Sequence, residues 1–227
     1  MEDELNQDEE LHPSELGTLQ YWEKIYEEEI NNFEDHGDVG EVWFGKRTTE
    51  NIVKSINDKL DISKSDKIVD VGCGNGWTLV QLAKKGFTNL IGVDYSSKAL
   101  DLAKAVLIEN KIDKSIVKLM VCDILVTDKS KNPLDNNFKL VHDKGTYDAI
   151  SLNFDNSKLM RENYIKNIHS ILLPDGYLTI SSCNWTKDEL IKHFNSHFDE
   201  FYTIHTPAMT FGGKTGSSVT SVFFKKK

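Results

Sequence analysis

The chain has 227 residues, of which 39% are hydrophobic and 28% are charged, which fits one large α/β domain with a sizeable core. Its formal net charge of −9 argues against a nucleic-acid backbone as the main partner, because neutralising phosphates requires a basic face. No apolar run approaches the ~20 residues of a membrane-spanning helix, and the N-terminus lacks the basic patch and apolar core of a secretory signal.

The three cysteines, Cys73, Cys122 and Cys183, are far apart and each lies near the end of an expected strand. This pattern indicates reduced thiols and neither disulfides nor a zinc site. His193 and His197 have the spacing of metal ligands, but no third ligand accompanies them, so a solvated helix face is the simpler interpretation. We expect a cytoplasmic protein, with the nucleus as a second location, and no metal.

The N-terminal region begins with an acidic stretch. Residues 1–15 contain seven Asp or Glu and no Lys or Arg, which predicts a disordered tail. Residues 16–227 are then expected to form a single domain, with an N-terminal helical segment over 16–62 and a Rossmann-like core over 63–227. Apolar residues at helical spacing predict amphipathic helices over residues 18–34 and 48–60.

A glycine-bracketed loop, residues 40–45, separates these two helices and contains the aromatic pair Trp43 and Phe44. Two interpretations have equal weight. The aromatic rings can pin the loop to the core, or they can close over a cofactor or substrate.

The most informative segment is residues 67–77, a short apolar strand that continues into Gly72, Gly74 and Gly76. It resembles the first strand and cofactor loop of S-adenosylmethionine (SAM) methyltransferases. Glycines allow a tight turn and the close approach of a nucleoside. The spacing disfavours the dinucleotide fingerprint G-x-G-x-x-G, which would need glycine where this chain has Trp77.

Two further strands each end in a carboxylate. Residues 89–94 end at Asp94, about twenty residues after the glycines, where both ribose hydroxyls of a nucleoside could donate to it. Asp94 could also serve as an acidic cap for the next helix. Residues 116–122 are followed by Asp123 and Ile124, which could accept from an adenine amino group and cover the ring, although Asp123 alone is a common kind of turn residue.

Residues 138–142 read as a fourth strand, which would place Asp143 at the carboxyl edge of the sheet, facing the reacting methyl group. An alternative strand over residues 147–153 would instead bring residues 153–155 to the site. That version faintly resembles the Asn-Pro-Pro-aromatic motif of amino-methylating nucleic-acid enzymes, but both prolines are absent.

Helices and strands are also expected to alternate in the C-terminal part of the chain. A helix near residues 165–172 turns at Pro174-Asp175-Gly176 into a strand over 177–182, and a helix over 187–198 follows. Strands over 201–205 and 219–224 suggest a final antiparallel pair. We therefore predict an α/β fold, the class I SAM-dependent methyltransferase type, with a seven-stranded sheet of order 3-2-1-4-5-7-6 and helices on both faces.

The resemblance narrows when five segments are taken together. These segments are residues 16–22, 40–45, 70–76, 143–150 and the glycine-rich 211–213. The combination resembles the protein-lysine methyltransferases that modify translation elongation factor 1-alpha, in particular the branch known as methyltransferase-like protein 10, over about residues 16–224. The resemblance implies SAM as cofactor, elongation factor 1-alpha as protein substrate, and no nucleic-acid or membrane partner. We expect a monomer.

The predicted site residues come from these segments and from the ends of the strands over residues 89–94 and 116–122. The cofactor-binding set is Trp43, Asp70, Gly72, Cys73, Gly74, Asp94, Tyr95, Cys122, Asp123, Ile124 and Asp143. The predicted catalytic residues are Asp143, which would orient the acceptor amine and accept its proton, and Tyr147, which would form an aromatic wall with Trp43, Phe44 and Phe211. Asp143 could alternatively be structural, capping the loop at Thr146. The rival functions are a methyltransferase with another acceptor and a catalytically silent SAM-binding module.

Overall fold

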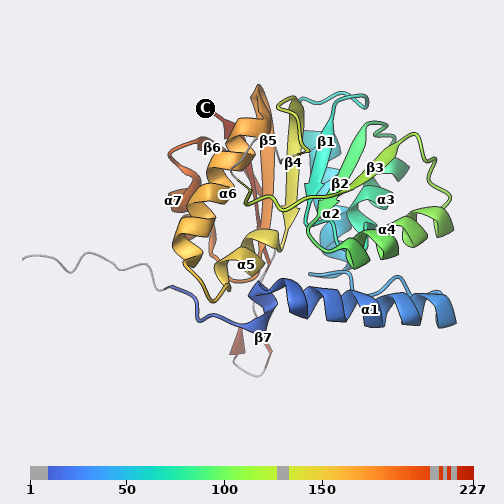
Figure 1. Ribbon diagram of the computed structural model, residues 1–227. Coiled ribbons are helices and arrows are strands. Elements are labelled where there is room, and N and C mark those ends of the chain that lie inside the picture. The colour runs from blue at the N-terminus through green and yellow to red at the C-terminus, as the bar shows by residue number, and fades with distance from the viewer. Residues whose placement is uncertain (1–9, 127–132, 205–209, 212–213, 216–218) are drawn as a thin grey trace, which may run out of the picture.

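Figure 1 shows the computed structural model of the chain, a central sheet with helices packed on both sides. The structure describes residues 10–126, 133–204, 210–211, 214–215 and 219–227. A long helix lies across one end of the sheet, at the edge where the parallel strands finish (Figure 1).

The sheet has seven strands in the order β3-β2-β1-β4-β5-β9-β6. The strands are β1 (Ile68–Val71), β2 (Leu90–Asp94), β3 (Val117–Val121), β4 (Phe138–Lys144), β5 (Leu172–Ser182), β6 (Phe198–Ile204) and β9 (Thr220–Lys226). The first five in this spatial order pair in parallel, whereas β9 runs antiparallel to both β5 and β6. Because β9 is the seventh strand of this sheet along the chain, the predicted order 3-2-1-4-5-7-6 is confirmed.

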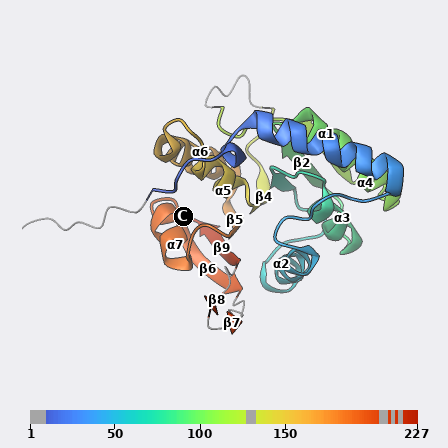
Figure 2. The same ribbon diagram turned by 90° about the horizontal axis from the view of Figure 1, so that it is seen from below.

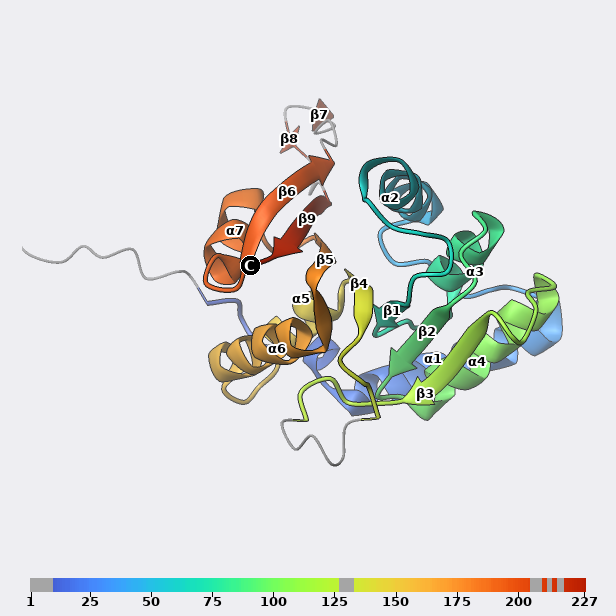
Figure 3. The ribbon, with the colours of Figure 1, turned by 90° about the horizontal axis from the view of Figure 1, so that it is seen from above.

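Two groups of helices cover the two faces of the sheet (Figure 3). One group is α2 (Lys46–Lys59), α3 (Trp77–Lys84) and α4 (Ser97–Glu109), and the other is α5 (Thr146–Ser151), α6 (Ser157–Ile171) and α7 (Lys187–Phe194). Successive residues of a strand point to opposite faces, so Ile68 joins the apolar core under the first group and Val69 the core under the second. None of the helices described here is long and apolar enough to cross a membrane.

The N-terminal helix α1 (Leu19–His36) lies along the carboxyl ends of the strands, beside α4 (Figures 1 and 2). Its first turn is capped by Thr18, whose side chain accepts from the Tyr21 N–H. Lys98 on α4 and Glu27 on α1 form an ion pair at 2.9 Å. The helix thus covers the edge of the sheet at which ligands of α/β proteins bind.

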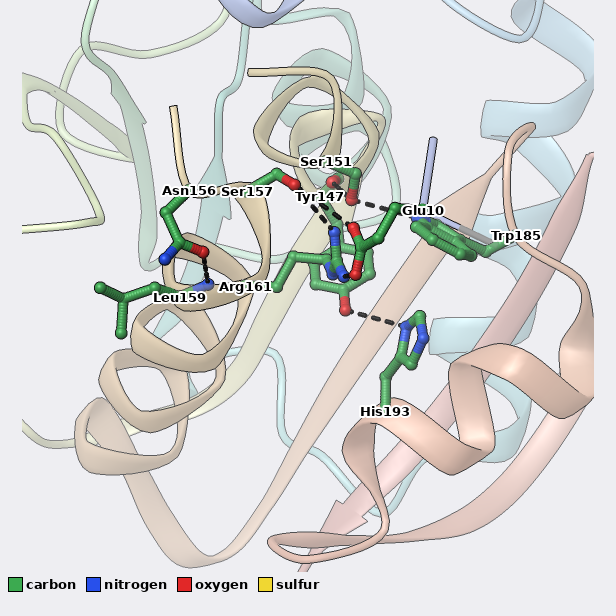
Figure 4. A network of polar contacts seen from close by, with 9 residues as sticks. All are labelled: Glu10, Tyr147, Ser151, Asn156, Ser157, Leu159, Arg161, Trp185 and His193. Carbon is green, nitrogen blue, oxygen red and sulfur yellow. Dashed lines mark hydrogen bonds and ion pairs between the residues drawn. The ribbon is translucent and has the colours of Figure 1, made fainter. Parts of the chain in front are cut away.

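A segment that we call the strap, residues 10–18, precedes α1 and includes the short 3₁₀ turn η1 (Glu15–Gly17). Glu10 pairs with Arg161 of α6 at 2.7 Å (Figure 4). The Ser14 N–H donates to the Leu152 carbonyl at 2.9 Å. The expected acidic tail extended to residue 15, but residues 10–15 lie against the domain, while the rest of it, residues 1–9, lies outside the described part. Arg161 is buried, so its charge requires the partner that Glu10 supplies.

The sequence left open whether residues 138–142 or residues 147–153 form the fourth strand. Residues 146–151 form helix α5, so the alternative strand over 147–153 is wrong. Gly145, with φ of 97°, turns the chain from β4 directly into this helix.

Element boundaries in the C-terminal part also differ. β5 already begins at Leu172, so the expected turn at residues 174–176 lies within the strand, beside a register irregularity opposite β4. Helix α7 ends at Phe194 because Phe198 pairs with Lys226 and buries its ring as the start of β6. Around the glycine-rich residues 211–213, β7 (Thr210–Phe211) pairs with β8 (Lys214–Thr215), and residues 212, 213 and 216, which are glycines, lie outside the described part of the chain.

His142, buried in β4 with its Nδ1 2.6 Å from Thr179 Oγ1, generates a stability prediction. Burial, and then the charge of Lys144, lower the pKa of His142 to about 3. Below about pH 6.5 the unfolded chain binds a proton at this histidine that the folded chain does not. The free energy of unfolding should therefore fall by about 1.4 kcal/mol for each pH unit below that value through this group.

Urea unfolding of the wild type and of His142→Gln, measured between about pH 7.5 and 5, tests this expectation. The variant cannot take up this proton, so the stability difference between the two proteins should shrink as the pH falls. A difference that stays constant over the range would contradict the prediction.

Candidate functional site

A cavity of about 200 Å³ lies at the carboxyl ends of β1 to β4. Its walls come from the strap, α1, the loop before α2, the glycine loop, the residues after β2 and β3, the start of α5 and the residues after β5. Of the predicted cofactor-binding residues, those on its wall are Trp43, Gly72, Cys73, Gly74, Asp94, Tyr95, Cys122, Asp123 and Ile124. The structure does not bring Asp70 or Asp143 to the wall; both are buried beneath it.

The glycine loop has the left-handed conformation that its composition predicts, with φ of 62° at Gly72 and 51° at Gly74. We expected glycine at these positions so that a nucleoside could approach, but the groups that lie close to Gly72 and Gly74 belong to the protein itself. A Cβ on Gly72 would lie 1.9 Å from Thr146 Oγ1, and one on Gly74 would lie 2.7 Å from the Tyr26 hydroxyl. Glycine therefore lets α1 and α5 approach this loop.

Asp94 at the end of β2 links two parts of the cavity wall. One carboxylate oxygen accepts from the Gly74 N–H and the other from the Ser96 N–H, each at 3.0 Å. The N-cap of α4 is Ser96, so Asp94 steadies the residues before the helix without capping it. The side chain is 5% exposed, and this burial raises its pKa to about 6.

The segment after β3 forms the adjacent wall. Asp123 is exposed and its Oδ1 accepts from the Leu125 N–H at 2.9 Å, which is the turn role considered from the sequence. Its side chain nevertheless lines the cavity next to buried Ile124, and Val93 of β2 adds a second aliphatic surface. Two carboxylates supply hydrogen-bond acceptors for ribose hydroxyls and an adenine amino group, and the apolar side chains between them suit a flat purine ring. The residues present therefore fit a nucleoside.

The geometry of Asp143 fits the structural role that the sequence offered as an alternative, in which its side chain caps the loop at Thr146. Its carboxylate accepts from the Thr146 N–H at 2.9 Å, the Tyr147 N–H at 3.1 Å and the Tyr164 hydroxyl at 2.5 Å. It is fully buried, which raises its pKa to about 7 despite these hydrogen bonds. The side chain therefore fixes the turn from β4 into α5.

Tyr147 does not face the cavity. Its ring is buried against Tyr164 and Phe194, and its hydroxyl lies 3.0 Å from His193 Nδ1 (Figure 4). Helical periodicity explains the difference, because Thr146, Ala149 and Ile150 share the face of α5 that lines the cavity. Sequence reasoning grouped Tyr147 with the site because it follows the Asp-Lys-Gly-Thr segment directly.

The aromatic wall of the cavity comes from the N-terminal part of the chain. Trp43 and Phe44 line it as expected, and Trp22 and Tyr26 of α1 join them. The Trp22 ring packs edge-on against Trp43 at 5.2 Å and stacks with Tyr26 at 6.0 Å. The side chain of Phe211, also expected in this wall, lies outside the described part of the structure.

Other residues of the cavity wall were not predicted as binding or catalytic residues. They include Leu16, Gly17, Trp22, Tyr26, Asn75, Lys144, Thr146, Asp148, Asn153, Cys183 and Asn184. Lys144, Thr146 and Asp148 belong to a segment already singled out, so its position after β4 was an available signal. Trp22 and Tyr26 read as a core-facing stripe. Asn153 was expected at the site only through the alternative strand over residues 147–153, and Cys183 was noted only as a thiol near the end of a strand.

Comparison with known proteins agrees with this geometry. Residues 62–223 match a family model described as a methyltransferase domain. EEF1A lysine methyltransferase 2 of Danio rerio is 39% identical over 220 residues, which cover 96% of this chain and 91% of that protein. Protein-lysine N-methyltransferase EFM4 of Saccharomyces cerevisiae is 34% identical over 228 residues, covering 96% and 97%.

A solved structure shares the fold at low identity. The N-methyltransferase NodS from Bradyrhizobium japonicum, in complex with S-adenosyl-L-homocysteine, superimposes with a TM-score of 0.59 at 14% identity, over 80% of this chain and 87% of that one. The strand order, the match to the family model and the similarity to these relatives over nearly the full length lead to one assignment. The chain belongs to the methyltransferase-domain proteins and, among them, to the family of protein-lysine methyltransferases that includes EEF1A lysine methyltransferase 2 and EFM4.

Proposed function

We propose that this protein binds SAM in the cavity and transfers methyl groups to a lysine side chain of translation elongation factor 1-alpha. The observation that carries the proposal is the similarity, over nearly the whole chain, to relatives named as lysine methyltransferases of that factor. The cavity supports it, because it combines a nucleoside-compatible end with an aromatic wall.

In this proposal the residues after β2 and β3 hold the nucleoside. Asp94 would accept from the ribose hydroxyls, Asp123 from the adenine amino group, and Ile124 would cover the ring. When bound, SAM supplies an electrophilic methyl group on a sulfonium whose leaving group departs neutral and needs no proton. The protein therefore contributes mainly positioning and the exclusion of water.

The acceptor lysine has two requirements that this cavity can meet. Its ammonium, with an unperturbed pKa of about 10.4, must lose a proton before the nitrogen has a lone pair. Trp43 and Phe44, with Trp22 behind Trp43, provide an apolar surface that disfavours the charged amine and contacts the methylated cation through ring faces. Asp143 is proposed as a positioning residue, because its oxygens already accept from Thr146, Tyr147 and Tyr164.

The first test is methyl transfer to purified elongation factor 1-alpha with SAM, followed by intact-mass and peptide mass spectrometry. We expect the factor to gain mass in steps of one methyl group on a single lysine. Asp94→Asn should reduce SAM affinity about tenfold or more, because it removes a charged acceptor, and transfer should fall accordingly. Asp101→Asn, an exposed site on α4, makes the same change of charge away from the cavity and should transfer normally.

Two negative outcomes have different meanings. If calorimetry shows SAM binding and the factor gains no mass, the acceptor is another molecule or the protein is a silent SAM-binding module. If SAM does not bind at all, the cofactor assignment fails as well.

SAM affinity should depend on pH through Asp94. Burial raises the pKa of Asp94 to about 6, so the carboxylate becomes protonated, and loses an acceptor position, as the pH falls below that value. Calorimetric affinity should therefore decrease by up to about tenfold per pH unit below about pH 6, and stay level above it. Asp94→Asn should bind weakly with no such step; an identical step in the variant would assign it to another group.

Truncation of Trp43 should impair methyl transfer, whereas truncation of Tyr147 should affect mainly stability. Trp43→Ala should raise the KM for the acceptor by about 2-fold to 30-fold, which corresponds to the loss of one ring contact with a cation. Tyr147→Phe should leave transfer rates within about 2-fold and lower the free energy of unfolding by about 1 kcal/mol, because its hydroxyl contacts His193 away from the cavity. Steady-state kinetics and urea unfolding measure both, and a large kinetic loss in Tyr147→Phe alone would contradict this arrangement.

A further inference from the structure

The connection between α1 and α2 brings Trp43 and Phe44 to the cavity, and we call its residues 39–45 the aromatic loop. Its backbone has an unusual conformation. Phe44, with φ of 63°, is one of two non-glycine residues with a positive φ in the described part of the chain, and Gly40 and Gly45 have φ of 77° and 83°. A left-handed aromatic residue is strained and persists only where surrounding contacts hold it. The contacts that hold this loop therefore decide where the two rings lie.

One of these contacts comes from the glycine loop. Asn75, the residue after Gly74, is 8% exposed. Its Nδ2 donates to the Val39 carbonyl at 2.9 Å and to the Glu41 carbonyl at 3.2 Å, and both carbonyls belong to the aromatic loop. Its Oδ1 accepts from the Trp77 N–H at 3.2 Å, at the start of α3. With its nitrogen and its oxygen both bonded to backbone groups, the Asn75 amide joins the glycine loop to the aromatic loop.

The glycine loop is also bonded to the cofactor end of the cavity. The Gly74 N–H donates to Asp94 Oδ2 at 3.0 Å, and Asp94 is the proposed acceptor for the ribose hydroxyls. A continuous series of contacts therefore leads from Asp94, through Gly74 and Asn75, to the carbonyls on either side of Gly40 in the aromatic loop. A ligand that orders the first of these groups limits the freedom of the last.

Two other side chains hold the aromatic loop from different elements. Glu29 of α1 accepts from the Glu41 N–H at 2.8 Å, and a Cβ on Gly40 would lie 2.5 Å from the Glu29 carboxylate. From β4, Lys144 Nζ donates to the Trp43 carbonyl at 3.1 Å. Of these side chains and Asn75, only Asn75 belongs to the glycine loop. It is therefore the contact through which a change at the cofactor end can reach the aromatic rings.

From this arrangement, and resting on the proposed function, we infer that Asn75 is a positioning residue that makes binding of the acceptor lysine depend on bound cofactor. SAM on Asp94 fixes the glycine loop, and Asn75 then holds the aromatic loop in its strained conformation. Because the cost of ordering this loop is met when the cofactor binds, the acceptor binds more tightly afterwards. The coupling is reciprocal, so the acceptor tightens cofactor binding by the same factor. The acceptor is thus engaged preferentially by enzyme that carries the methyl donor.

The first test is calorimetric binding of elongation factor 1-alpha to the enzyme with and without S-adenosyl-L-homocysteine. The wild type should bind the factor about fivefold or more tightly when S-adenosyl-L-homocysteine is present, the lower end of the usual coupling between two sites. Asn75→Ala removes both donors and should bring this ratio close to one, while its affinity for S-adenosyl-L-homocysteine alone stays near the wild-type value. Asn75→Asp keeps the acceptor for the Trp77 N–H and should lose the ratio as well.

Two further variants separate the coupling from a general loss of contacts. Glu29→Ala loosens the aromatic loop from the side of α1, so it should weaken binding of the factor in both states and keep the ratio. Glu29→Gln retains an acceptor for the Glu41 N–H and should restore the affinity. The matched control is Asn89→Ala, which removes an amide donor to the Ser65 carbonyl at the opposite end of β2 and should behave as the wild type.

A second readout needs no acceptor. Hydrogen exchange followed by mass spectrometry reports how often the backbone of residues 39–45 opens. The Glu41 N–H donates to Glu29 and the Gly45 N–H donates to the Val42 carbonyl at 2.7 Å, so both report on the aromatic loop. In the wild type, S-adenosyl-L-homocysteine should slow their exchange. In Asn75→Ala it should slow exchange in the glycine loop only.

Three results would overturn the inference. If the wild type binds the factor equally well with and without S-adenosyl-L-homocysteine, the two sites are not coupled. If Asn75→Ala weakens binding of S-adenosyl-L-homocysteine and leaves the ratio unchanged, Asn75 only shapes the cofactor site. If S-adenosyl-L-homocysteine slows exchange in residues 39–45 equally in the wild type and in Asn75→Ala, the two loops are not joined through this residue. A wild type that binds no factor in either state contradicts the proposed acceptor, and the exchange result distinguishes that failure from a failure of the contact between the loops.

Discussion

The hydrogen bonds of the Asp143 carboxylate are the interaction on which both sides of the cavity depend. By accepting from Thr146, Tyr147 and Tyr164, it fixes the turn from β4 into α5. The Thr146 hydroxyl, held by that turn, donates to the Val71 carbonyl at 2.8 Å, directly before the glycine loop. A buried carboxylate is costly unless its oxygens are satisfied, and here three donors offset much of that cost while locking two loops together.

The two parts of the cavity come from different portions of the chain. The residues that suit a nucleoside lie within the segment that matches the general methyltransferase domain, residues 62–223. Trp22, Tyr26 and Trp43 come from the preceding segment, which the similarity to the lysine methyltransferases also covers. This division agrees with a shared scaffold for the cofactor and a family-specific wall for the acceptor.

The sheet and the strand-end residues were predictable because a parallel sheet brings the residues after β1, β2 and β3 to one edge. Asp94, Asp123 and the glycines follow from that rule alone. Asp143 was expected to face the cavity, but β4 continues to Lys144 and the Asp143 carboxylate accepts from the Thr146 and Tyr147 N–H groups beneath the wall. Tyr147 was misplaced because α5 has only six residues, too few for periodicity to show which residues face the cavity. Residues 16–22 were among the segments that carry the family resemblance, but the position of Trp22 and of the strap on the cavity wall could not be found from the sequence. Their places depend on contacts with distant residues, as in the hydrogen bond from Asn153 to the Gly17 carbonyl.

The strap has a consequence for the order in which the molecule can assemble. Leu16 and Gly17 form part of the cavity wall, and the ion pair that anchors their segment joins Glu10 to Arg161, 151 residues later. During synthesis the N-terminal segment emerges first, yet it cannot dock until α6 has been made. Cys183 and Asn184, which follow β5, line the cavity as well, so its wall cannot be complete until the chain has been made to that point.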